Sequence, residues 1–263
     1  MAEYQLGNPA NRIVKYSAVA FPCQNKTNSL KQPDGYYRVI VGAFNAYNHS
    51  GFFYPFSQGI KKLYDVGGVI RRRLDNGLCK SEWGHPKLDG LNDEQVLRRI
   101  VRIDDDRVCN FIRDITLESA KDETRKDIIL VVASIIPLGP FGGFLQQELD
   151  IPEVNVAWSI RSFTAPPILL PNGIRAKVVK DVFTYDKVIE PGIPQATMFS
   201  TANLIGVECL SDDLFITESM MDRVIKYNYT SGLENDGSVL KMVKTTLGWT
   251  KVQVTDIRAI DWV

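Results

Sequence analysis

Short segments rich in β-branched and aromatic residues recur through the middle of the chain, and they constrain its fold more than any other feature. Such segments are typical of strands, and we expect strands at Tyr37–Phe44, Ile128–Ile136, Asn155–Phe163 and Ile174–Ile189. They do not alternate with helices in a regular βαβ rhythm, and the glycine fingerprint of dinucleotide-binding sheets is absent. The sequence therefore predicts an α+β fold with an antiparallel sheet at its centre.

Apolar residues at helical spacing run from Pro55 to Ile70, and the turn-forming run Asp75-Asn76-Gly77 follows them. This pattern predicts one helix of about five turns. A shorter helix is expected at Pro140–Leu149, and further helices after residue 210, where Ser211 suits an N-terminal cap.

Two other strand-like segments, Ile100–Ile103 and Val108–Ile115, flank the acidic run Asp104-Asp105-Asp106-Arg107, which predicts a hairpin. Sequence repeats and long linkers are absent. Because predicted helices replace the predicted strands after residue 210, we expect a main domain over residues 1–210. Residues 211–263 are expected to form a C-terminal α/β appendage that packs on the same domain.

Charge and hydropathy argue against polyanion and membrane partners. The 263 residues include 31 Lys plus Arg and 31 Asp plus Glu, so the formal net charge is zero. The protein as a whole therefore has no net electrostatic attraction for nucleic acid. The nearly continuous apolar run Ile128–Ile136 is shorter than the roughly 20 residues that cross a bilayer. The first residues lack the pattern of a secretory signal, so we expect a cytosolic location.

Cysteine and histidine are too scarce and too scattered to predict a metal site. The four cysteines form no C-x-x-C pair, and we expect reduced, mostly buried thiols; they are Cys23, Cys79, Cys109 and Cys209. With only His49 and His85 available as imidazole ligands, neither a metal nor another cofactor is expected.

Histidine is the commonest general base near neutral pH, which leaves two candidates. His49 lies in a polar loop before the predicted helix, and we interpret it as an exposed, non-catalytic residue. His85 follows that helix, and Pro86 restricts its backbone to an extended conformation. Alone, a histidine in this position is more often structural or solvated than catalytic.

Ser159 and Arg161 occupy alternate positions of one predicted strand, so both side chains project from the same face. The simplest interpretation of this segment alone is a polar outer face of a half-buried strand. Asp186 lies near the end of the next predicted strand pair. Asp181 and Glu190 compete with it as a carboxylate that orients a histidine.

Four segments together resemble the prohead proteases of tailed phages, in particular the T-even type, which are related in fold to the herpesvirus assemblins. The segments are Asn48–Pro55 before the helix, Glu82-Trp83-Gly84-His85-Pro86, Ala157-Trp158-Ser159-Ile160-Arg161 and Asp186–Pro191. They are similar to the family patterns N-R-N-x-R-x-Y-P, G-E-L-x-H-P, G-x-S-S-R and D-x-V-x-x-P-S, in the same order over roughly residues 37–200. The chain departs from these patterns at several positions, including Ala157 for glycine and Ile160 for serine.

The resemblance implies a closed or nearly closed antiparallel β-barrel with surrounding helices. It implies a serine endopeptidase in which Ser159 is the nucleophile, His85 the general base and Asp186 the residue that holds the imidazole. Arg161 is either a support for the oxyanion or a structural ion-pair partner. The implied substrates are the phage's own scaffold, core and capsid proteins, cleaved after glutamate inside the assembling prohead in the host cytoplasm. Self-cleavage at Leu117-Glu118 or at Ile216–Ser219 is a further expectation, and homo-oligomerisation is left open.

Two other interpretations remain at this stage. The substitutions around Ser159 suit a prohead-core or virion protein that keeps the fold without activity, because fold does not fix function. A nucleic-acid-binding module would use the arginines Arg71–Arg73, Arg98, Arg99 and Arg102. The second is disfavoured, since Arg71–Arg73 end a helix, where cations suit the helix dipole, and the net charge is zero.

Overall fold

The computed structural model describes residues 13–21, 31–48, 50–122, 125–189, 215–230 and 234–249. Its strands are β1 (Ile13–Phe21), β2 (Tyr37–Phe44), β3 (Ala46–Tyr47), β4 (Phe53–Tyr54), β5 (Lys80–Glu82), β6 (Val108–Lys121), β7 (Asp127–Pro137), β8 (Ala157–Thr164), β9 (Ile168–Leu169), β10 (Arg175–Ala176), β11 (Val179–Val188) and β12 (Phe215–Thr217). Its helices are α1 (Gln58–Lys62), the π-helical turn η2 (Leu63–Gly67), α2 (Val69–Asp75), α3 (Asp93–Val101), the 3₁₀ turn η3 (Asp105–Arg107), α4 (Gly142–Asp150), α5 (Glu218–Thr230) and α6 (Glu234–Thr246).

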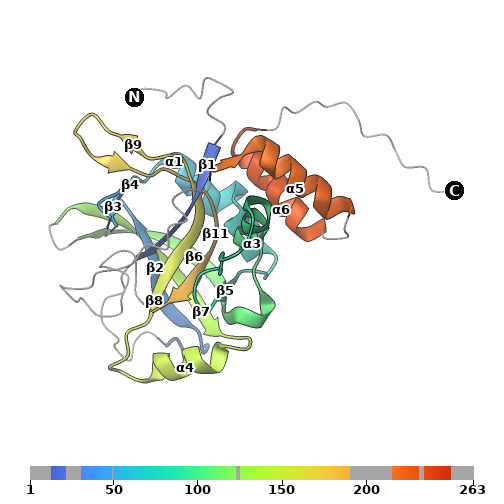
Figure 1. Ribbon diagram of the computed structural model, residues 1–263. Helices are drawn as coiled ribbons and strands as arrows, with labels where there is room; N and C mark the ends of the chain where they lie inside the picture. Colours follow the sequence, from blue (N-terminus) through green and yellow to red (C-terminus); the bar gives the residue numbers. More distant parts are fainter. Residues whose placement is uncertain are drawn as a thin grey trace.

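The strands pair in three four-stranded sheets, with the orders β11-β8-β1-β12, β2-β7-β6-β5 and β3-β4-β10-β9 (Figure 1). The first two sheets are antiparallel throughout. An isolated parallel bridge between Trp83 and Lys187 joins the segment after β5 to β11. The α+β class and the antiparallel pairing are therefore confirmed. Within the described residues the pairings leave open sheets rather than a closed barrel.

Alternation along β8 divides the apolar residues between two cores. Trp158 and Ile160 belong to a large cluster with Tyr185 and with residues of β2, β6 and β7. Phe163, on the opposite face, belongs to a second cluster formed with helices α3, α5 and α6. Each fully buried side chain of this size stabilises the fold by about 1.5–3 kcal/mol. The face of β8 that carries Phe163 also carries Ser159 and Arg161.

The helix predicted from Pro55 is interrupted. It is divided into α1, η2 and α2, and Gly68, with φ −84° and ψ 160°, separates the last two. The prediction of one continuous helix was wrong because apolar spacing does not reveal the backbone contact made there. A Cβ on Gly68 would lie 2.3 Å from the Leu63 carbonyl oxygen.

The hairpin predicted around Asp104–Arg107 was also wrong. Ile100 and Val101 end helix α3, where both are buried, and only the segment from Val108 onward is a strand. Helix α3 begins with a capping box, in which Asn92 and Gln95 each accept a hydrogen bond from the other's backbone N–H. The strand-like composition of residues 100–103 therefore belongs to a helix end and the loop after it.

The other predicted elements are present with small boundary changes. Strand β2 matches Tyr37–Phe44, β7 and α4 match the predicted strand and helix within two residues, and β11 lies within Ile174–Ile189. Helices α5 and α6 lie side by side next to α3 (Figure 1). The Ser211 cap and the proposed division at residue 210 lie outside the described residues.

Candidate active site

Ser159 and Asp186 face each other across two paired strands. In the antiparallel β8–β11 ladder Ser159 is the direct partner of Asp186. Directly opposite residues place their side chains on the same face of a sheet. Ser159 is 2% exposed and Asp186 is fully buried. The fold thus brings these two predicted site residues together, although 26 residues lie between them in the sequence.

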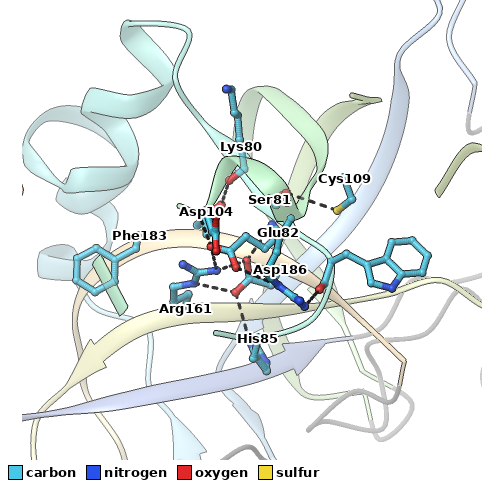
Figure 2. A network of polar contacts seen from close by, with 12 residues as sticks. Lys80, Ser81, Glu82, His85, Asp104, Cys109, Arg161, Phe183 and Asp186 are labelled. Carbon is cyan, nitrogen blue, oxygen red and sulfur yellow. Dashed lines mark hydrogen bonds and ion pairs between the residues drawn. The ribbon is translucent and has the colours of Figure 1, made fainter. Parts of the chain in front are cut away.

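His85 reaches the same place from the loop after β5. The bridge from Trp83 to Lys187 and a hydrogen bond from the Gly84 N–H to the Lys187 carbonyl, 2.6 Å long, hold this loop along β11. Gly84 has φ +79°, a conformation that glycine adopts without strain. The His85 Nδ1 atom then lies 3.3 Å from the Asp186 Oδ2 atom (Figure 2). The His85 side chain keeps 12% of its surface exposed.

Two neighbours fix the Asp186 carboxylate. The Arg161 Nε atom donates to Oδ2 at 2.8 Å and its Nη2 atom donates to Oδ1 at 2.7 Å. The Glu82 backbone N–H donates to Oδ1 at 3.1 Å. Burial alone would raise the pKa of Asp186, but Arg161 and His85 hold that pKa below its ordinary value. The carboxylate is therefore ionised near neutral pH and can orient an imidazole.

The Arg161 guanidinium is directed at carboxylates and a carbonyl. It is fully buried, and besides the two bonds to Asp186 it donates from Nη1 to the Arg102 carbonyl at 2.8 Å. Its Nη2 atom also lies 3.1 Å from the Glu82 Oε1 atom. Of the two roles left open by the sequence, this geometry favours the structural ion-pair partner over support of an oxyanion.

Glu82 is the buried residue of this site to which the sequence analysis gave no role. Its side chain is fully buried and is paired with Arg99 of α3 and with Arg161. It lies in the segment Glu82–Pro86 that contains His85, and only His85 of that segment was given a role. The signal that could have found it is its match to the glutamate of the family pattern G-E-L-x-H-P.

The competing carboxylates have other surroundings. Asp181 is buried, and its Oδ1 atom accepts from the backbone N–H groups of Val69 and Val182. Burial raises the pKa of Asp181 to about 7, although these two bonds lower it. Glu190 and His49 lie outside the described residues. Among the carboxylates of the described part of the chain, Asp186 is the one hydrogen-bonded to His85.

The described cysteines are poor nucleophiles. Cys79 and Cys109 are both buried and free, and Cys23 and Cys209 lie outside the described residues. Burial raises the pKa of Cys79 to about 12 and raises that of Cys109 as well. Neither thiol is ionised near neutral pH, which leaves serine as the candidate nucleophile of this site.

Within the described ranges, clusters of three or more His, Cys, Asp or Glu side chains arranged to bind a metal ion are absent. None of the helices in that part of the chain combines the length and apolar character needed to span a bilayer.

Sequence comparisons extend over most of the chain. The model of the Peptidase S80 family matches residues 16–245. A protein named capsid maturation protease, from Pseudomonas phage phiKZ, is 30% identical over 250 residues, which cover 91% of this chain and 89% of the relative. No solved structure matches the chain.

Proposed function

Since the chain belongs to the Peptidase S80 family, we propose that it is a serine endopeptidase of phage capsid maturation, with Ser159, His85 and Asp186 as its catalytic residues. Family membership also confirms the resemblance to phage prohead proteases. The observation that carries the assignment of residues is the alignment of Ser159 with Asp186 across β8 and β11, together with the 3.3 Å contact between His85 and Asp186.

The proposed reaction follows from the roles that this geometry allows. With Nδ1 donating to Asp186, His85 has Nε2 left to accept the proton of the Ser159 hydroxyl. The Ser159 oxygen forms a bond to the scissile carbonyl carbon, and the resulting imidazolium returns the proton to the leaving amine. Water then attacks the carbonyl carbon of the acyl-enzyme and gives a proton to His85. The ester C–O bond breaks, the imidazolium returns that proton to the Ser159 oxygen, and the acid product leaves.

The substrates proposed are the scaffold, core and capsid proteins of the phage, cleaved after glutamate inside the assembling prohead in the host cell. Support for this comes from the name of the phiKZ relative, which is a capsid maturation protease, and from the family resemblance. The two candidate sites of self-cleavage lie in regular structure. Glu118 lies on β6 and pairs with Arg38, and Glu218 begins α5. Self-cleavage there would require local unfolding, since exposed loops are the preferred sites of cleavage.

The experiment that tests this proposal is co-expression with a candidate scaffold protein, read by mass spectrometry for new termini. We expect Ser159→Ala and His85→Ala each to reduce cleavage by roughly 10³-fold or more while the protein stays folded, because each removes one member of a cooperating set. Ser134→Ala on β7, a buried serine outside the site, is the matched control and should cleave normally.

A serine-reactive phosphonate separates this proposal from an inactive structural protein. Only an activated serine reacts readily, so the wild type should be labelled at Ser159 and the Ser159→Ala variant should not. Absence of both labelling and cleavage in the folded wild type would instead support the prohead-core or virion structural role. Near-normal cleavage by Ser159→Ala would exclude Ser159 as the nucleophile.

A further inference from the structure

A second buried carboxylate, that of Glu82, lies next to Asp186 (Figure 2). Glu82, the last residue of β5, is fully buried. Its backbone N–H donates to Asp186 Oδ1 at 3.1 Å, and its own Oε1 atom lies 3.1 Å from Arg161 Nη2. Glu82 therefore contacts both the carboxylate that holds His85 and the guanidinium that holds that carboxylate.

Helix α3 and the loop after it fix the other side of Glu82. Arg99 forms a two-point pair with it, with Nη1 to Oε1 at 2.9 Å and Nη2 to Oε2 at 2.5 Å. The Asp104 backbone N–H donates to Oε1 at 2.8 Å. The Arg107 Nε atom lies 3.7 Å from Oε2. Bidentate pairs of this kind fix geometry as well as supplying attraction.

From these contacts we propose that Glu82 is a positioning residue for the reaction, an inference that rests on the proposed function. Glu82 holds Arg161 in its two-point contact with Asp186, and Asp186 in turn orients His85. Its negative charge also offsets the charges of the partly buried Arg99 and the fully buried Arg161, so that the imidazolium formed during the reaction does not face an excess of positive charge. Without Glu82, Arg161 would keep Asp186 as its carboxylate partner, and Arg99 would keep only the more distant Asp104, 4.0 Å away, among the described residues.

The remaining charged groups near Asp186 have partners of their own. Arg73 of α2 donates to the Phe183 and Val101 carbonyls. Lys187 of β11 pairs with Glu148 of α4 at 2.8 Å. Asp104, after α3, lies 4.0 Å from Arg99. None of these groups is changed in the variants described below. The direction in which each variant moves the pH profile therefore follows from the one charge that it removes.

The test measures the rate at which a fluorophosphonate labels Ser159 between pH 5 and 9. The acidic limb of this profile, where the rate rises with pH, reports the loss of a proton from the essential general base. Glu82→Gln removes a negative charge, which disfavours the imidazolium, so we expect the limb to move to lower pH by roughly 0.5–1 unit. The plateau rate should fall about 10–100-fold because Asp186 is held less precisely.

Two further variants keep the test decisive even where Glu82→Gln fails to fold. Arg99→Gln removes a positive charge from the same network. The acidic limb of its pH profile should therefore move to higher pH, in the direction opposite to that expected for Glu82→Gln. Glu82→Asp keeps the charge on a shorter side chain, so the limb should stay in place while the plateau rate falls. Glu94→Gln, on the same helix α3 but in an exposed pair with Arg223, is the matched control and should leave both unchanged.

The outcomes separate the two proposals. If the wild type is labelled at Ser159 and the acidic limbs of Glu82→Gln and Arg99→Gln lie at the same pH, the inference is overturned and the proposed function stays intact. Limbs that move in the same direction for these two variants overturn it as well. A folded wild type that neither labels nor cleaves overturns the proposed function and this inference with it.

Discussion

Two buried aspartates on one strand show how the surroundings of a residue decide what it can do. Asp181 and Asp186 are both fully buried on β11. Asp186 faces Arg161, which holds its pKa below the ordinary value despite burial. Asp181 accepts backbone N–H groups at Oδ1, and burial raises its pKa to about 7 although these bonds, Thr246 and the charge of Arg73 lower it. Asp186 is therefore an anion where the proposed reaction needs one, whereas Asp181 is more readily protonated near neutral pH.

This contrast gives a matched pair of substitutions. Asp186→Asn preserves the size of the side chain but removes the charge that holds the His85 Nδ1–H, so we expect cleavage to fall by roughly 10³–10⁴-fold. Asp181→Asn removes a carboxylate of the same strand that does not contact His85 and should cleave at a near-normal rate. Steady-state cleavage and circular dichroism of both variants check this. Equal loss in the two folded variants would contradict the role of Asp186.

At the scale of single elements, Gly68 explains why the first long helix is interrupted. The residue adopts an extended conformation between η2 and α2, at a point where the chain passes close to the Leu63 carbonyl. Helix α2 then restarts with the Val69 N–H donating to Asp181 of β11 at 3.1 Å. The interruption thus allows the first turn of α2 to be capped by a residue of the sheet.

The adjacent glycines allow a direct test of this close contact. Gly68→Ala would place a Cβ 2.3 Å from the Leu63 oxygen, so the backbone must move, and we expect a loss of about 1–3 kcal/mol in the free energy of unfolding. Gly67→Ala is the control, because nothing lies within 4 Å of its Cβ position. It should be neutral or stabilise the protein by up to about 1 kcal/mol. Urea denaturation measures both, and equal effects would contradict the steric argument.

The elements also show which predictions sequence patterns can support. The strand Tyr37–Phe44 was predicted with its exact bounds, because local composition and burial agree there. Ile100 was assigned to a strand from its neighbours, but the capping box of Asn92 and Gln95 starts a helix that reaches it. After the break at Gly68, the Val69 N–H donates to Asp181, more than 100 residues later in the chain, and local periodicity cannot reveal this contact.

At the scale of the whole molecule, the candidate site is assembled from segments far apart in the sequence. Glu82 and His85 come from β5 and its following loop, Ser159 and Arg161 from β8, and Asp186 from β11. The sequence motifs predicted which residues to examine, and strand alternation predicted that Ser159 and Arg161 share a face. The pairing of β8 with β11 and the ion pairs around Glu82 depend on tertiary structure, and they were found only in the fold.

The buried carboxylates also make the stability of the whole protein depend on pH, in opposite directions and in separate ranges. Asp186 has a lowered pKa, so its contribution to stability is lost only as pH falls below about 4, toward its folded pKa. The folded pKa of Asp181, about 7, lies above its unfolded value, so the folded state binds a proton that the unfolded state releases. Stability from Asp181 is therefore complete below pH ~4 and is lost as pH rises through about 7.

Comparison with Asp181→Asn isolates this dependence, since every other titrating group is common to both proteins. The variant has no carboxyl at position 181 to ionise, so its unfolding free energy, relative to the wild type, should increase between pH 4.5 and 8.5. An increase of roughly 1–4 kcal/mol is expected, the upper figure being the full raised pKa converted at 1.36 kcal/mol per unit. Urea denaturation at the two pH values measures it. A difference that is the same at both pH values would mean that Asp181 is already ionised in the fold at pH 4.5, and the hydrogen bonds from Val69 and Val182 would then outweigh the effect of burial.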